Sequence, residues 1–424
     1  MLRRRRQGQH RRAAVGCALL LAATACAGPD QPPATTGSGA PHTQRDSSRA
    51  PDAPEDRTNG RDGFTLVASG DILPHDAIIE QARKDADGQG FDFRPMLAAA
   101  RPLAHGADLS ICHMETVYAA TRGPFTGYPA FRTPPQIAGA IRDTGYDSCS
   151  TASNHTLDAG PAGVTRTLNA MDAAGLRHSG SARSAAERAA PPLLRAGGAT
   201  VAHLAYTYGT NVGADSRGIP LDAARPWLVN RTDPVRILED ARAARRAGAD
   251  VVVLSMHWGT EWQEQPDDEQ LELARHLTSA RDGGRRVVDL ILGTHAHVPQ
   301  AYEKVNGTWV VYGMGDQLAG EMSDPRGSMG STARFAFAPP SRRGGEWRVR
   351  AAEFTPHLVV GEPDFRLVDL TEVPEASSDE ASSTEVSSTE VSSDERARYV
   401  RARNLITRAV LARGAAKDGL RASR

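Results

Sequence analysis

Short apolar segments recur through the middle of the chain, and most of them run directly into an Asp, Asn, Glu or His. They lie at residues 64–69, 107–112, 146–150, 200–206, 250–256, 287–293 and 309–313. Apolar runs of this length, bounded by turn residues, are typical of buried strands. Segments with helical spacing lie at residues 135–144, 164–174, 233–247 and 267–280. Strands that alternate with helices predict an α/β layered domain.

The polar residues that follow these strands predict a single functional rim, because α/β domains gather their ligand-binding residues at one edge of the sheet. These residues are Asp71, His75, His113, Glu115, Asn154, His155, His257, His295, His297 and Asp316. Oxygen and imidazole donors suit Mn, Fe or Zn. The sequence contains no CxxC motif, so it gives no indication of a metal site with thiolate ligands. A set of this size fits two divalent ions that share a ligand.

Each of these residues also has a structural interpretation. Asp71 could cap a helix, and Asn154 with His155 could form a turn. His295 and His297 are the stronger indication of a metal site, because alternation in an extended segment would put both imidazoles on one side. The formal net charge of −1 gives no reason to expect a nucleic acid as partner.

The first 26 residues have the features of an export signal: a basic start, a short apolar run and small residues before Cys26. The run from Ala13 to Ala25 is short for a membrane span. The stretch Ala23-Thr24-Ala25-Cys26 resembles a bacterial lipoprotein cleavage site, with Ala23 in place of the usual Leu. We expect lipidation at Cys26 and an exported protein held on the extracellular side of a bacterial membrane. Plain secretion and an uncleaved anchor are the alternatives.

The rest of the chain divides by composition into four segments. Residues 27–62 and 371–396 have the composition of disordered segments, a tether and an acidic low-complexity linker. Residues 63–370 form the expected folded domain, and residues 397–424 a basic helix that docks on it or lies on anionic lipid. Cys112 and Cys149 hold corresponding places in two predicted strands. They could form a disulfide or remain buried thiols.

The motifs also come in a distinctive order. They are Gly70-Asp71, Glu115-Thr116, Asn154-His155, Asp158-Ala-Gly160, His257-Trp-Gly259, Gly293-Thr-His295-Ala-His297 and Tyr312-Gly-Met-Gly315. In this order they resemble the CapA family of poly-γ-glutamate capsule biosynthesis proteins, a branch of the calcineurin-like metallophosphatase superfamily. The resemblance covers about residues 64–337. It implies a layered, metallophosphatase-like β-sandwich flanked by helices, and two divalent metal ions.

The resemblance also implies roles for single residues. The implied metal ligands are Asp71, Glu115, Asn154, His257, His295 and His297. His155 would be catalytic, contacting a scissile phosphate or protonating a leaving group, and Trp258 and Glu261 would line the pocket. His113 and Asp316 depart from the family pattern, which has Asn at both positions. Both residues, and His75, are candidates for further ligands or for hydrogen bonds to ligands.

The sequence leaves three functions open. The resemblance implies a protein of capsule or poly-γ-glutamate-type envelope polymer production, with a two-metal phosphoesterase-like site for a polymer or phosphorylated substrate. The same fold could instead serve a non-catalytic envelope lipoprotein that binds the polymer or a polymer synthase complex. A metal-dependent hydrolase of γ-glutamyl amide bonds is the third.

Overall fold

The computed structural model describes residues 63–190, 192–212, 221–342, 345–371, 373 and 392–423. The expected export signal with Cys26, the tether and most of the acidic linker lie outside the described residues. None of the helices within the described ranges combines the length and the apolar character that a membrane crossing requires.

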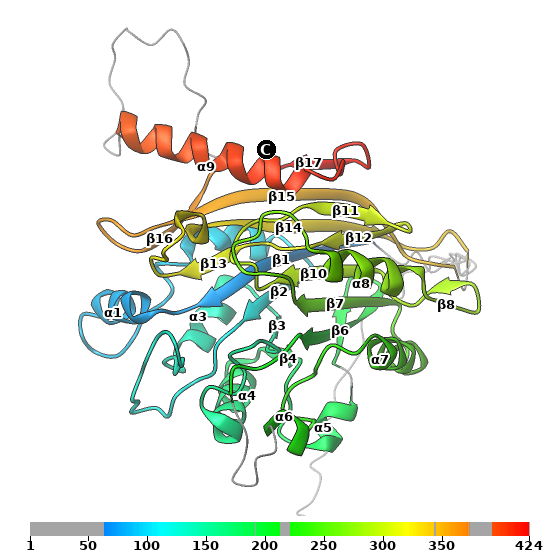
Figure 1. Cartoon of the computed structure of the whole chain (residues 1–424), viewed down its shortest axis with the longest axis horizontal. Helices are drawn as coiled ribbons and strands as arrows, with labels where there is room; N and C mark the ends of the chain where they lie inside the picture. Colours follow the sequence, from blue (N-terminus) through cyan, green and yellow to red (C-terminus); the bar gives the residue numbers. More distant parts are fainter. Residues whose placement is uncertain are drawn as a thin grey trace, which may run out of the picture. The chain divides into compact units, whose positions relative to one another are not determined.

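The larger of two facing sheets has β1 in the middle of its strand order (Figure 1). That order is β16 (Arg366–Asp369), β15 (Arg348–Val360), β14 (Met329–Ala338), β1 (Phe64–Leu73), β2 (Leu109–Met114), β3 (Ser148–Ser150) and β4 (Arg177–Ser179). In addition, β13 (Asp316–Ala319) pairs with the end of β1, and β17 (Leu420–Ala422) pairs with β15. Because β1, β2, β3 and β4 run parallel, their carboxyl ends meet at one edge.

The smaller sheet also brings parallel strand ends together. Its order is β11 (Tyr302–Val305), β12 (Thr308–Val311), β10 (Leu290–Thr294), β7 (Val251–His257), β6 (Ala199–Thr207) and β5 (Leu193–Ala196). The strands β12, β10, β7 and β6 are parallel. The core between the sheets contains Leu66 and Ile111 from one sheet and Val253 and Leu292 from the other. A two-stranded ribbon, β8 (Arg281–Asp282) with β9 (Arg285–Arg286), stands apart.

Helices cover the outer faces of both sheets. The larger sheet packs against α1 (Asp76–Asp85), η1 (Ala98–Ala100), α2 (Arg101–His105), α3 (Ile137–Thr144) and α4 (Gly160–Ala174). The smaller sheet packs against α7 (Pro234–Arg246) and α8 (Asp268–Ser279). Short helices α5 (Ala185–Ala189), α6 (Leu221–Ala224) and η2 (Pro325–Ser328) lie in connections. The predicted fold class, an α/β layered sandwich flanked by helices, is confirmed.

Local sequence accounts for where the long helices begin. The Asp233 side chain accepts hydrogen bonds from the backbone N–H groups of Val235 and Arg236, which caps α7. At the start of α8, Asp267 and Gln270 form a reciprocal capping box. Both helices were expected at these positions, and each observed boundary lies within a residue or two of the predicted one.

The C-terminal helix α9 (Ser393–Leu411) is part of the folded unit. It contacts β14 and β15, and its Tyr399, Ile406 and Val410 are buried in the core that lies between the sheets. After it, β17 adds a parallel strand to β15. A domain boundary at residue 370 therefore leaves out two elements that belong to the domain.

Cys112 and Cys149 are register partners on the adjacent strands β2 and β3, and they form a disulfide. The sequence left open whether these cysteines form a disulfide or remain buried thiols, and in the structure they form the disulfide. Both cysteines are buried.

Candidate metal centre

Buried carboxylates and imidazoles gather where parallel strands of both sheets end. Asp71 lies on β1 and His113 on β2, with Glu115 just beyond it. His257 is the last residue of β7, and β13 begins with Asp316. His295 and His297 follow the end of β10. The two sheets thus contribute to one cluster, as the pattern of strand ends predicted.

Asp71 contacts residues from both sheets. Its Oδ1 is 3.5 Å from His113 Nε2 and 3.8 Å from His257 Nδ1. Its Oδ2 accepts a hydrogen bond from the backbone N–H of His295, with N and O 3.2 Å apart. Gly70 precedes Asp71 because a Cβ at that position would collide with the carbonyl oxygen of Gly315. The glycine of the Gly-Asp motif therefore permits the close approach of β1 to the start of β13.

Glu115 forms the second centre of the cluster. Its Oε1 is 3.9 Å from His257 Nε2 and 3.9 Å from His297 Nε2. On its other side, His297 places Nδ1 2.9 Å from Asp316 Oδ1. Asn154 Oδ1 lies 2.9 Å from His257 Nε2. These contacts link Asn154, His257, Glu115, His297 and Asp316 into one continuous set.

The segment that carries His295 and His297 is not extended, so the expectation of strand-like alternation is wrong. The strand β10 ends at Thr294. His295 and His297 have φ angles of 93° and 54°, in the left-handed region that side chains other than glycine rarely adopt. The two rings still lie together, with centroids 6.1 Å apart. Backbone strain of this kind is typical of functional sites.

Burial strongly shifts the pKa values of the carboxyl groups. It raises the pKa of Asp71 to about 7, although nearby His297 acts in the opposite direction. Burial also raises the pKa of Glu115 well above its usual range, with repulsion from Asp71 and Asp316 adding to it. The pKa of Asp316 is raised by burial as well. Without a bound cation, burial therefore disfavours the ionised form of these carboxyl groups.

The imidazoles respond to the same burial. It lowers the pKa of His113 and of His295 to about 3, and that of His257 well below its usual value. His297 differs: burial alone would lower its pKa, but Asp316, Glu115 and Asp71 together raise it well above 6.5. Three neutral imidazoles therefore stand beside acidic groups, which is the state in which imidazole binds a metal.

Several buried polar atoms of the cluster have no hydrogen-bond partner within the described part of the chain. They are both carboxylate oxygens of Glu115, His113 Nε2, His295 Nδ1 and Asp316 Oδ2. Each such atom costs roughly 1–3 kcal/mol if it stays unpaired. Sets of ligand atoms lying within 4.8 Å of one another come from Asp71 with His113 and His257, from Asp71 with Glu115 and His297, and from Glu261 with His295 and His297. The unpaired atoms and the donor chemistry fit divalent cations.

His155 lies beside this cluster and is held by Asp158. His155 Nδ1 is 2.6 Å from Asp158 Oδ2, which also accepts a hydrogen bond from the Phe131 backbone N–H at 2.8 Å. The Phe131 ring meets the His155 ring edge-on, with centroids 4.7 Å apart. The pairing fixes the orientation of the ring and favours the tautomer with its proton on Nδ1.

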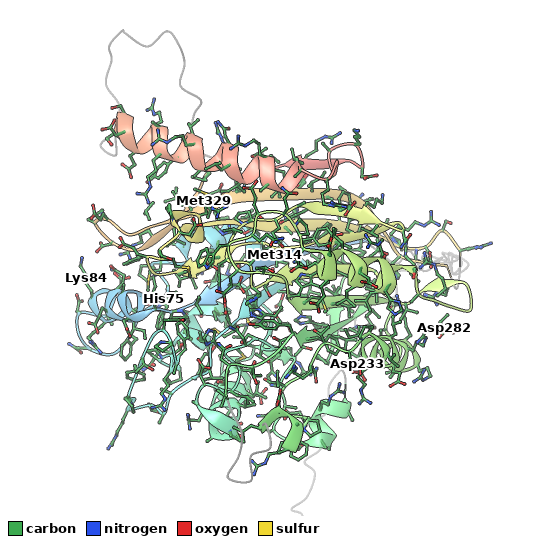
Figure 2. All side chains as sticks on the ribbon, in the orientation of Figure 1. His75, Lys84, Asp233, Asp282, Met314 and Met329 are labelled. Atoms are coloured by element: carbon green, nitrogen blue, oxygen red, sulfur yellow. A yellow bond between two sulfur atoms is a disulfide. The ribbon has the colours of Figure 1, made fainter. Side chains whose placement is uncertain are left out.

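Two of the predicted site residues do not join the cluster. His75, labelled in Figure 2, lies just before α1 and accepts a hydrogen bond at Nδ1 from the backbone N–H of Gly320. It belongs to none of the ligand sets among the described residues. Trp258 was expected to line the pocket, but it is 4% exposed and packs in the core under α7 and α8. Its Nε1–H donates to the Tyr312 carbonyl oxygen, away from the site.

Aromatic residues that the sequence did not single out surround the cluster instead. The ring centroid of Tyr208 is 4.6 Å from that of His295. The ring centroid of Trp262 is 5.6 Å from that of His297. Tyr208 follows a predicted strand in the same way as the ligands do, so its position directly after β6 was the available signal. Trp262 lies four residues after Trp258, and nothing in the spacing distinguished the buried ring from the one at the site.

The fold and the site together define an α/β sandwich protein with a buried cluster of carboxylate and imidazole donors suited to divalent metal. The family model described as bacterial capsule synthesis protein PGA_cap matches residues 65–321. The chain belongs to this family, and the predicted kinship with CapA proteins is confirmed.

The chain is also similar to individual members of the family. It is 28% identical over 222 residues to a Mycobacterium tuberculosis protein named "Probable polyglutamine synthesis accessory protein", and the match covers 49% of this chain and 55% of the relative. It is 27% identical over 177 residues to the PGA biosynthesis protein CapA of Bacillus subtilis, and the match covers 42% of this chain and 43% of the relative. The chain thus spans about half the length of the curated relatives it matches.

Solved structures with related architecture are distant. The calcineurin-like phosphoesterase YfkN from Bacillus subtilis has a TM-score of 0.38 and 14% identity, covering 69% of this chain and 90% of that one. A 5'-nucleotidase precursor from Thermus thermophilus has a TM-score of 0.42 and 15% identity, covering 70% and 54%. Similarity at this level carries no information about activity.

Proposed function

We propose that this protein is a metal-dependent phosphoesterase-like hydrolase that acts in the production of a capsule or poly-γ-glutamate-type envelope polymer. The observation that carries the proposal is the set of unpaired, buried oxygen and nitrogen atoms on Glu115, His113, His295 and Asp316. The names of the relatives support the polymer context. A polymer synthase complex and a phosphorylated or polymer-linked substrate are the partners that this context suggests.

The chain's own residues divide into metal-holding and proton-handling groups. Asp71, Glu115, Asn154, His257, His295 and His297 would hold the ions, with His113, Asp316 and Glu261 in reach of the same positions. A pair of divalent ions at such a site supplies an activated water and stabilises charge during displacement at phosphorus.

His155, oriented by Asp158, would donate the proton that the leaving oxygen needs. The exposed Tyr208 ring beside His295 would contact the substrate.

We further propose that the protein works outside the cytoplasm, held to the membrane by lipid on Cys26. The basic start, the short apolar run and the Cys26 context support export. The Cys112–Cys149 disulfide also supports it, because disulfides persist mainly in oxidising compartments. Membrane fractionation tests the anchor: Cys26→Ala should move the protein from the membrane to the soluble fraction, and retention in the membrane would contradict lipid attachment.

The hydrolase proposal is tested with the full-length protein purified in detergent. Metal content is measured first, and hydrolysis of a chromogenic phosphodiester is then followed with added Mn²⁺. His295→Ala should lower both bound metal and rate. On an alkyl phosphodiester, whose leaving oxygen needs the proton, His155→Ala should lower the rate by about 10²–10⁴-fold and leave the metal content unchanged. The matched control is His276→Ala, an exposed histidine on α8 that should change neither.

The outcomes separate the alternatives. Protein that binds metal but hydrolyses no phosphoester would favour the non-catalytic binding function or the γ-glutamyl amide hydrolase. A rate that is unaffected by both His155→Ala and His295→Ala would contradict the proposed site.

A further inference from the structure

The disulfide between Cys112 and Cys149 lies directly beside the candidate metal centre along both of its strands. In the register of β2 and β3, Cys112 is opposite Cys149, and the next pair is His113 opposite Ser150. His113 Nδ1 lies 2.7 Å from Ser150 Oγ, and the same hydroxyl is 3.4 Å from the Cys112 carbonyl oxygen. The cross-link is thus one residue away from the contact that orients His113.

The cross-link and the imidazole use opposite faces of the same sheet. Side chains alternate along a strand, so Cys112 packs with the helix-covered core and Ile111 with the core between the sheets. His113 points to the same side as Ile111, where its Nε2 is 3.5 Å from Asp71 Oδ1. Its ring stacks on His257 with centroids 4.8 Å apart. A bond on one face therefore fixes the backbone from which a ligand projects on the other.

The disulfide acts on a short stretch of sheet, in which β3 also pairs with β4 and the Ser110 backbone N–H donates to the Asp147 carboxylate. The strand β3 contains three residues, and its pairing with β2 is limited to that length. A slip of one residue would turn Ser150 to the opposite face and remove the partner of His113. Outer partners of this kind fix the ring orientation of ligating histidines.

We propose that the Cys112–Cys149 disulfide is a positioning element of the metal centre. It fixes the register of β2 and β3, and through Ser150 it holds His113 as a metal ligand. This role depends on the metal centre of the proposed function. The two thiols lose two protons and two electrons when the bond forms. A disulfide-bearing oxidant takes them up by thiol–disulfide exchange and becomes a dithiol. Full metal affinity then requires an oxidising compartment.

The test measures the affinity of the metal-free, full-length protein for Co²⁺, read from the visible absorption bands of the bound ion. The double substitution Cys112→Ala with Cys149→Ala should weaken Co²⁺ binding about 10–100-fold and change the spectrum. Ser150→Ala should weaken binding by a similar factor with the disulfide intact. The matched control is Ser148→Ala, two residues earlier on β3, whose hydroxyl contacts His203 and not His113. It should leave the affinity unchanged.

Unchanged affinity and an unchanged spectrum in the double cysteine variant would overturn the inference. So would a Ser150→Ala variant that binds Co²⁺ as the Ser148→Ala variant does. If the double variant fails to fold by circular dichroism, Co²⁺ affinity is compared between the oxidised wild-type protein and wild-type protein whose disulfide has been reduced and the reductant removed, and equal affinity overturns the inference. Failure of the proposed function looks different: the oxidised wild-type protein would bind Co²⁺ with the expected dependence on Ser150, yet hydrolyse no phosphoester.

Discussion

Single residues at the candidate site are arranged for chemistry at a cost to stability. Glu115 has two buried carboxylate oxygens without a partner among the described residues, and burial raises its pKa well above the usual range. His295 and His297 adopt left-handed backbone conformations. A fold selected only for stability would remove such features, because each one costs free energy. Their concentration at one sheet edge is what distinguishes this site from the rest of the protein.

A first prediction concerns Asp158, which orients the proposed acid His155. Asp158→Asn keeps the side-chain volume and the acceptor for the Phe131 N–H, but it removes the charge beside His155 Nδ1. We expect kcat to fall about 10²-fold while KM and metal content stay unchanged. The loss should be smaller for a phosphoester with an acidic leaving group, which needs no proton.

The effects of His155 and Asp158 should not add, because both substitutions remove one function. The double variant His155→Ala with Asp158→Asn should be no slower than His155→Ala alone. A further drop of similar size in the double variant would show that Asp158 acts independently of His155.

At this scale the sequence predicted residue types better than side-chain directions. Every ligand candidate on a strand end was found because an apolar run led into it. Trp258 was misplaced because it continues the alternation of Leu254 and Met256, which places its indole in the core under the helices and on the opposite face from His257. His75 was misplaced for a related reason: Leu73 ends β1, so His75 follows the chain into α1 and away from Asp71.

Among the elements, the strands that carry ligands were predictable and those near the C-terminus were not. The strand β7 is a continuous apolar run between a helix and a histidine, which is a strong signal. In β14 the buried residues include Gly330, Ser331, Thr332 and Ala333, small or polar residues that dilute the apolar pattern. These positions are buried because β15 and β1 flank the strand on both sides, which is long-range information.

A second prediction concerns the docking of α9. Ile406 is 1% exposed and belongs to the core between the sheets. Ile406→Ala should lower the free energy of unfolding by about 2–5 kcal/mol, because it removes buried apolar groups and leaves a cavity. Equilibrium unfolding in urea measures the change.

Arg408→Ala provides the control on the same helix, since this side chain is exposed. It should shift the unfolding free energy by less than about 0.5 kcal/mol. Equal and small effects of the two substitutions would mean that α9 contributes nothing to the cooperative unit.

For the whole molecule, metal binding and stability should be linked through pH. The folded metal-free protein holds the pKa of Asp71 at about 7, above its ordinary value of 3.8. Because the folded state binds the Asp71 proton more tightly than the unfolded state does, Asp71 stabilises the fold at low pH. This contribution is lost as the pH rises toward 7. His113 acts in the opposite sense: its pKa is lowered to about 3, so its contribution is lost as the pH falls below about 6.5.

A third prediction follows for metal. A divalent ion binds the ionised carboxylates, so binding releases protons below about pH 7. Affinity for Mn²⁺ should rise by up to about tenfold per pH unit for each proton released, between about pH 5.5 and 7, and then level off. The increase in Tm caused by Mn²⁺ should accordingly be larger at pH 8 than at pH 5.5.

Asp71→Asn separates the effect of bound metal on stability from the effect of the buried Asp71 carboxyl group. The variant should lose the metal-induced rise in Tm, while its metal-free form at pH 8 should be at least as stable as the metal-free wild type. A metal effect on Tm that is the same at pH 5.5 and pH 8 would contradict the linkage.

The place of β1 between β2 and β14 has a practical consequence for anyone dividing this gene. The family match ends at residue 321, while β14 begins at Met329 and pairs with β1 from Phe64 to Ala68. A fragment cut at the end of the match would expose one edge of β1 as an open template for aggregation. The unit that is inherited as a recognisable family and the unit that can fold therefore have different ends. The ends of a graft, a truncation library or an expression fragment should therefore be set by the folding unit and not by the family match.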